Sequence, residues 1–271
     1  MTPRTREPQA RHERYCAEIE HQLRQLRDVV TSGADLSATV PTCPDWTLEQ
    51  LVRHTGGSLR WVELNVRTRA EEEVPEERVP LYDGPDKQGD PAELDAWLAR
   101  TGEELLATLR EAGPGAPVWS WGWERTAGFW ARRMTHELVV HRADATLAAG
   151  LPYEVAPEIA ADAIDEWLEI VEFVQRTQPH DAAAELRGPG RSIHLHATDA
   201  PADVTAEWFV DLTEKGVRWR HGHEKATVAL RGPLTEVLLA FYRRLPPDGG
   251  RLEVLGDREL LDFWLERATF G

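Results

Sequence analysis

Apolar residues recur at helical spacing through the first two thirds of this chain, in long segments that glycine and proline separate. The first segment covers residues 9–31. The second follows Thr47, a predicted N-cap with which Gln50 completes a capping box, and it extends to about residue 70. Three more are expected at 91–112, 126–149 and 157–176. Four long helices joined by loops predict an antiparallel four-helix bundle within residues 1–176.

The hydrophobic pattern changes near residue 180, where period-two alternation replaces the helical spacing. Four stretches alternate in this way: RSIHLHAT, EWFVDLT, GVRWRHG and KATVALRG. A helix at 233–244, a strand at 251–255 and a helix at 257–268 complete the pattern. We therefore expect a two-domain α+β protein. Residues 177–190, which include Pro and Gly, are the expected linker, and residues 191–271 form the expected α+β module.

Composition narrows the classes of partner. The chain has 271 residues, and its net charge of −16 argues against nucleic acid or an anionic membrane, which both favour basic surfaces. No segment reaches the roughly 18 apolar residues of a membrane span. Two cysteines provide no disulfide framework, and the first residues lack the apolar stretch of a signal peptide. A cytoplasmic protein is expected.

A candidate metal motif lies in FWARRMTHELVVHRADA, residues 129–145. His136 and His141 are five positions apart, about 140° around a helix, so they cannot share a face. Glu137 and His141 are four apart and do share one. The pattern therefore favours Glu137 and His141 as metal ligands, with His136 pointing elsewhere. The alternative is a pair of side chains on the helix surface.

A third ligand is expected from TCPDWTLEQLVRHTGG, residues 42–57. His54 lies on the apolar side of its predicted helix, where a histidine usually packs in the core without binding metal. If it faces Glu137 and His141, the set is His₂Glu with an open position, a known arrangement for catalytic zinc. Nickel, iron or manganese would also accept these ligands. Asp144 could orient His141, or it could lie on the surface.

The stretches VPTCPDWTLEQLVRHTGG (40–57) and WARRMTHELVVHRADA (130–145) resemble the two signature stretches of the mycothiol-dependent maleylpyruvate isomerase family. The C-terminal stretches RSIHLHATD, ATVALRGP and LEVLGDRELLDFWL resemble that family's C-terminal module. The resemblance covers residues 10–268. It implies a DinB-like metal-binding bundle, a sterol-carrier-like module, and metal ligands at His54, Glu137 and His141.

The resemblance also implies a mechanism. Mycothiol, a low-molecular-weight thiol, would be the cosubstrate, and coordination to the metal would deprotonate it. The thiolate would add to a small electrophilic substrate and cause either isomerisation or S-transfer. A metal-dependent hydrolase and a non-enzymatic small-molecule carrier are the alternatives. The sequence leaves open whether the protein is a monomer or a homodimer.

Several other residues are candidates for function. Arg133, Arg231 and Arg258 could bind an anionic substrate. Cys43 could act as a nucleophile, but its place in a Pro-flanked loop favours a half-buried structural role. Histidines at 194, 196, 221 and 223 could suggest a second metal. Because no cysteine and no spaced carboxylate accompanies them, the sequence argues against that site.

Overall fold

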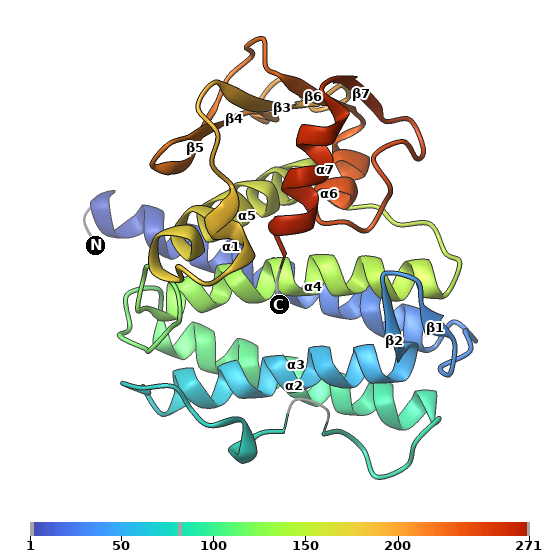
Figure 1. The fold of residues 1–271 in the computed structure, drawn as a ribbon. Coiled ribbons are helices and arrows are strands. Elements are labelled where there is room, and N and C mark those ends of the chain that lie inside the picture. The colour runs from blue at the N-terminus through green and yellow to red at the C-terminus, as the bar shows by residue number, and fades with distance from the viewer. Residues whose placement is uncertain (1–2, 81–82, 270–271) are drawn as a thin grey trace. The chain divides into compact units, whose positions relative to one another are not determined.

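Long helices build the N-terminal part of the chain (Figure 1). The computed structural model describes residues 3–80 and 83–269, and the first compact unit ends at Tyr153. Within the described residues of this N-terminal unit, four long helices pack around one apolar core. They are α1 (Pro3–Val30), α2 (Leu48–Arg67), α3 (Pro91–Ala112) and α4 (Ala127–Ala148). The predicted four-helix bundle is therefore confirmed, apart from the relative directions of its helices.

The chain directions of α2 and its neighbours follow from side-chain contacts. His54 and Trp61 of α2 pack against His141 and Trp130 of α4, respectively, so α2 and α4 are antiparallel. In contrast, α2 and α3 run parallel, because residues later in α2 contact residues later in α3. The connection between α2 and α3 crosses the length of the bundle and contains the 3₁₀ helix η1 (Glu76–Arg78). The bundle thus mixes parallel and antiparallel neighbours, which differs from the expected antiparallel arrangement for α2 and α3.

Side-chain caps fix where the bundle helices begin. Thr47 and Gln50 form the predicted capping box at the start of α2, with both reciprocal hydrogen bonds present. Asp90 caps α3 and Thr126 caps α4, each by accepting hydrogen bonds from backbone N–H groups of the first turn. These caps satisfy backbone N–H groups that the first turn of a helix leaves without an intrahelical partner.

A short β-hairpin occupies part of the segment expected to be a loop. Strands β1 (Thr39–Val40) and β2 (Cys43–Thr47) pair in antiparallel fashion, although two prolines lie within or beside them. The hairpin contacts both α2 and α4. It therefore covers the bundle where these two helices adjoin.

The C-terminal unit begins at Glu154 and is built on a mixed sheet. In its described residues the strand order is β5-β4-β3-β6-β7, with β3 and β6 parallel and the other pairs antiparallel. The strands are β3 (Arg191–Ala197), β4 (Glu207–Thr213), β5 (Gly216–His221), β6 (Val228–Gly232) and β7 (Glu253–Gly256). The helices are α5 (Pro157–Thr177), η2 (Ala182–Glu185), α6 (Leu234–Phe241) and α7 (Arg258–Arg267).

Helix α5 belongs to this C-terminal unit, which differs from the expected division at residues 177–190. Buried Gln175 of α5 accepts a hydrogen bond from the Val217 N–H of β5 and donates to the carbonyls of Ala183 and Leu186. Tyr242 also donates to a carbonyl of α5. An amphipathic helix pattern does not specify which apolar surface the helix covers, so the sequence could not assign α5 to its unit.

Within residues 3–80 and 83–269 we find no helix that combines the length and the apolar character of a membrane span.

Candidate metal centre

The three predicted ligands converge in the N-terminal unit. One ligand atom each from His54, Glu137 and His141 lies within 4.8 Å of the others, and we call this set the bundle cluster. His54 comes from the second turn of α2, and the other two lie one turn apart on α4. The imidazole rings of His54 and His141 are 5.3 Å apart and nearly perpendicular. The spacing argument thus identified side chains that meet across two helices.

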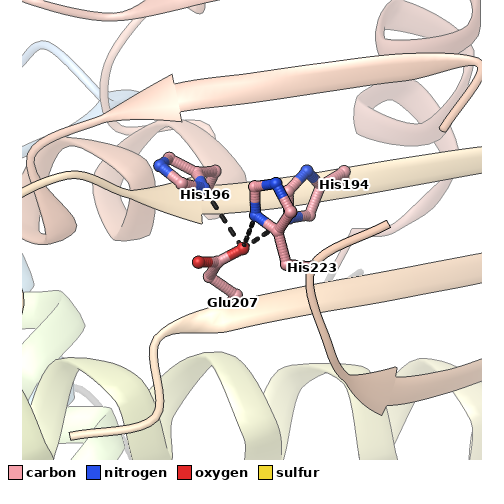
Figure 2. Close-up of side chains that lie close together, drawn as sticks. All are labelled: His194, His196, Glu207 and His223. Carbon is pink, nitrogen blue, oxygen red and sulfur yellow. Dashed lines mark hydrogen bonds and ion pairs between the residues drawn. The ribbon is translucent and has the colours of Figure 1, made fainter. Parts of the chain in front are cut away.

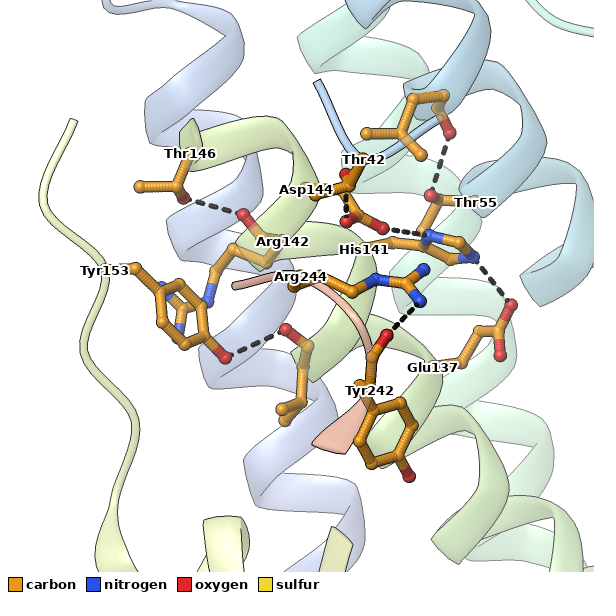
Figure 3. A network of polar contacts seen from close by, with 12 residues as sticks. Thr42, Thr55, Glu137, His141, Arg142, Asp144, Thr146, Tyr153, Tyr242 and Arg244 are labelled. Carbon is orange, nitrogen blue, oxygen red and sulfur yellow. Dashed lines mark hydrogen bonds and ion pairs between the residues drawn. The ribbon is translucent and has the colours of Figure 1, made fainter. Parts of the chain in front are cut away.

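His141 lies at the centre of a chain of polar contacts (Figure 3). Its Nε2 is 3.0 Å from Oε1 of Glu137, and its Nδ1 is 3.1 Å from Oδ2 of Asp144. Asp144 is fully buried and accepts a hydrogen bond from the Thr42 hydroxyl in the β1–β2 hairpin. A carboxylate that holds one imidazole nitrogen leaves the other directed at the cluster, as in many metal sites.

Opposite charges stabilise the ionised form of Glu137. Burial alone would raise the pKa of this carboxyl group, but His141 and Arg133 hold it well below its usual range. Arg133 donates to Oε2 of Glu137 at 3.1 Å, so the Oε1 atom is the one that faces His141. Glu137 therefore offers a charged oxygen to the cluster.

The two histidines differ in their protonation. Burial lowers the pKa of His54 to about 4, helped by the nearby His141, so its imidazole is neutral at pH 7. Burial would also lower the pKa of His141, but the carboxylates of Glu137 and Asp144 raise it to about 9. The cluster without metal consequently holds a proton on His141 that a metal ion would displace. His54 also packs against the Trp46 indole, at 4.7 Å between ring centroids.

Other predicted residues lie in varied surroundings. His136 is fully buried and contacts Tyr15 of α1, so it points away from the bundle cluster, as predicted. Cys43 is partly buried in β2 and packs against the bundle core. Arg231 pairs with Glu253 and Arg258 with Asp262, both in the C-terminal unit. Their role in substrate binding remains a prediction.

The structure also brings together histidines whose grouping the sequence disfavoured. His194 and His196 of β3 and His223, just after β5, surround Glu207 of β4. Glu207 is the carboxylate that the sequence analysis missed, because it lies opposite His196 only in the register of β3 and β4. The sequence did offer one signal for this grouping, because His194, His196 and Glu207 lie on two successive predicted strands.

Comparisons with known proteins agree with this fold. Residues 16–146 match the model of the mycothiol maleylpyruvate isomerase N-terminal domain, and residues 158–263 match that of the MDMPI C-terminal domain. No protein with a curated description matches the chain.

Two solved structures share the fold. One is a crystal structure of the mycothiol-dependent maleylpyruvate isomerase, with a TM-score of 0.54 and 14% identity. The other is a variant of that enzyme with a histidine replaced by alanine, with a TM-score of 0.52 and 13% identity. Each match covers 90% of this chain and 92% of the other.

The fold and the bundle cluster define a two-part protein in which a helical bundle carries a candidate metal centre and an α+β unit follows. Both parts match domain models of one family, in the order in which they occur along the chain. The chain belongs to the mycothiol-dependent maleylpyruvate isomerase family.

Proposed function

We propose that this protein is a metal- and mycothiol-dependent isomerase or S-transferase that acts on a small electrophilic substrate. The observation that carries the proposal is the convergence of His54, Glu137 and His141 within 4.8 Å in a chain of this family. Two imidazole nitrogens and one carboxylate oxygen match a catalytic zinc site that keeps a position open. The donor set fits zinc and also other divalent metals that accept nitrogen and oxygen ligands.

The reaction proposed needs no protein nucleophile. The thiol sulfur adds to one carbon of a cis alkene, the carbon–carbon double bond becomes single, and rotation about it follows. Loss of the thiol then restores the alkene as the trans isomer, so the thiol is regenerated. If the sulfur stays and a proton adds to the other carbon, the product is a thioether. A bound divalent metal would supply the positive charge that favours thiolate over thiol near neutral pH.

The side chains around the cluster hold its ligands in place. Asp144, supported by Thr42, holds the Nδ1 proton of His141, so Nε2 is the atom available to a metal. Arg133 holds one oxygen of Glu137 and leaves the other for the cluster. Because Arg133 is buried next to the cluster, it is also the first candidate for binding a substrate carboxylate.

The test is turnover by the full-length protein supplied with zinc, mycothiol and maleylpyruvate. We expect the trans isomer or a thioether adduct to form, to require the thiol, and to be lost in His54→Ala. Chromatography with mass spectrometry separates these products. Thiol-independent hydrolysis of ester or amide substrates, lost in the same variant, would instead support the hydrolase alternative.

A further inference from the structure

The C-terminal unit contains a group of metal-ligating side chains distinct from the bundle cluster. His194, His196, Glu207 and His223 each place one ligand atom within 4.8 Å of the others, and we call them the sheet cluster. His194 and His196 project from the same face of β3, because they are two residues apart on one strand. Glu207 lies on β4, directly opposite His196 of β3. His223 follows β5, which pairs with the other side of β4.

All three imidazoles direct a nitrogen at a single oxygen atom (Figure 2). Oε2 of Glu207 lies 3.0 Å from Nε2 of His194, 3.2 Å from Nδ1 of His196 and 2.6 Å from Nδ1 of His223. The ring centroids lie 5.1–5.5 Å apart. Ligand atoms around tetrahedral zinc, with bonds of about 2.0–2.1 Å, are about 3.3 Å apart. The distances from Oε2 of Glu207 to His194 and His196 are close to that value, and the distance to His223 is shorter.

The ligands of the sheet cluster differ in exposure. The side chain of His194 is 7% exposed and that of Glu207 is 32% exposed. His223 has a side chain that is 73% exposed, so it can rotate toward an ion without repacking the core.

We propose that His194, His196, Glu207 and His223 form a second divalent-metal site, of the closed four-ligand type that holds structural zinc. With four protein ligands the site leaves no position for substrate, unlike the three-ligand bundle cluster. Its ligands join β3 and β4 to residues 222–227, which connect β5 to β6 without regular structure. The ion would therefore fasten this connection to the sheet.

The first experiment measures zinc bound per full-length chain by elemental mass spectrometry after dialysis. His223→Ala removes an exposed ligand and should lower the content by one equivalent, with little effect on the fold. His221→Ala, two residues earlier and with a side chain that is 36% exposed, is the control and should keep the parent value. Equal zinc content in the parent and His223→Ala would overturn the proposal, as would loss of zinc in His221→Ala. Neither result depends on the bundle cluster, which His54→Ala tests separately.

A second measurement uses the parent chain and so does not depend on how a variant folds. Diethyl pyrocarbonate modifies an imidazole nitrogen that has a free lone pair. Zinc at Nδ1 of His223 leaves the proton on Nε2, so zinc should block modification of this exposed ring. His221 should be modified equally with and without zinc. Modification of His223 at the same rate in both states, mapped by peptide mass spectrometry, would contradict the proposal.

Discussion

Asp144 holds His141 by one imidazole nitrogen, at 3.1 Å between Oδ2 and Nδ1, while the other nitrogen faces Glu137 at 3.0 Å. If the bundle cluster binds metal, Asp144→Asn should weaken zinc binding by about 10–100-fold, as loss of such an orienting carboxylate does elsewhere. The substitution preserves size, so the fold should remain intact by circular dichroism. Competition with a chromophoric chelator measures the affinity. Unchanged affinity would mean that Asp144 does not orient a ligand.

His54→Ala should remove metal from the N-terminal unit, because it deletes one of three ligands from the bundle cluster. His136→Ala is the control, since it also deletes a buried imidazole from the same bundle but one that faces α1. It should lower the free energy of unfolding through the cavity it leaves and still retain the metal. Elemental analysis of both variants beside the parent decides the matter. Equal metal content in His54→Ala and the parent would show that the site is assigned wrongly.

The stability of the metal-free protein should fall as pH rises from about 6.5 to 9. An unfolded histidine loses its proton near 6.5, whereas the pKa of His141 in the fold is about 9, mainly because Glu137 overcomes the effect of burial. Between these values only the folded state holds the proton, so the free energy of unfolding decreases with pH. His54, with a pKa of about 4, is neutral in the folded state over this window, and in the unfolded state it is largely neutral above about pH 7.5. Its lowered pKa therefore adds little slope over most of the window.

Urea denaturation at several pH values, with chelator present, measures this dependence. Zinc removes the proton from His141, so the zinc-loaded protein should lose this part of the slope. His141→Gln should lose it in the metal-free state as well. A metal-free parent with the same stability at pH 6.5 and 9 would contradict the assigned protonation.

Gly56→Ala should destabilise the bundle by about 1–3 kcal/mol, the usual cost of overpacking a core. Gly56 is buried in α2, and a methyl group there would overlap the ring of Trp97 in α3. Gly115→Ala is the control, because a methyl group at that position would meet open space. Thermal or urea unfolding compares the two variants. Equal stability would show that α2 and α3 can separate without cost.

Much of this fold could be predicted from the sequence because its helices carry both periodicity and caps. Thr47 and Gln50 form the predicted capping box, and β4 has the bounds of the alternating stretch EWFVDLT. The β1–β2 hairpin was missed because Pro44 lies within it and because strands this short have no period to detect. The parallel course of α2 and α3 depends on how the 68–90 connection crosses the bundle, which helical spacing does not encode.

The bundle cluster and the sheet cluster differ in how far the sequence could predict them. Glu137 and His141 could be paired from spacing because a single helix fixes their geometry. Glu207 could not be paired with His196, since the connection between β3 and β4 leaves the strand register open until the sheet forms. The sequence therefore predicts clusters that lie within one element better than clusters that depend on how elements pair.

The antiparallel neighbours α2 and α4 are separated along the chain by the whole of α3 and its connections. A nascent chain that has emerged only as far as α3 therefore carries a single donor of the bundle cluster, His54. The proposed capture of an ion must wait until the ribosome has released α4 and the bundle has closed. Metal acquisition would then be one of the last events in the biosynthesis of the N-terminal unit.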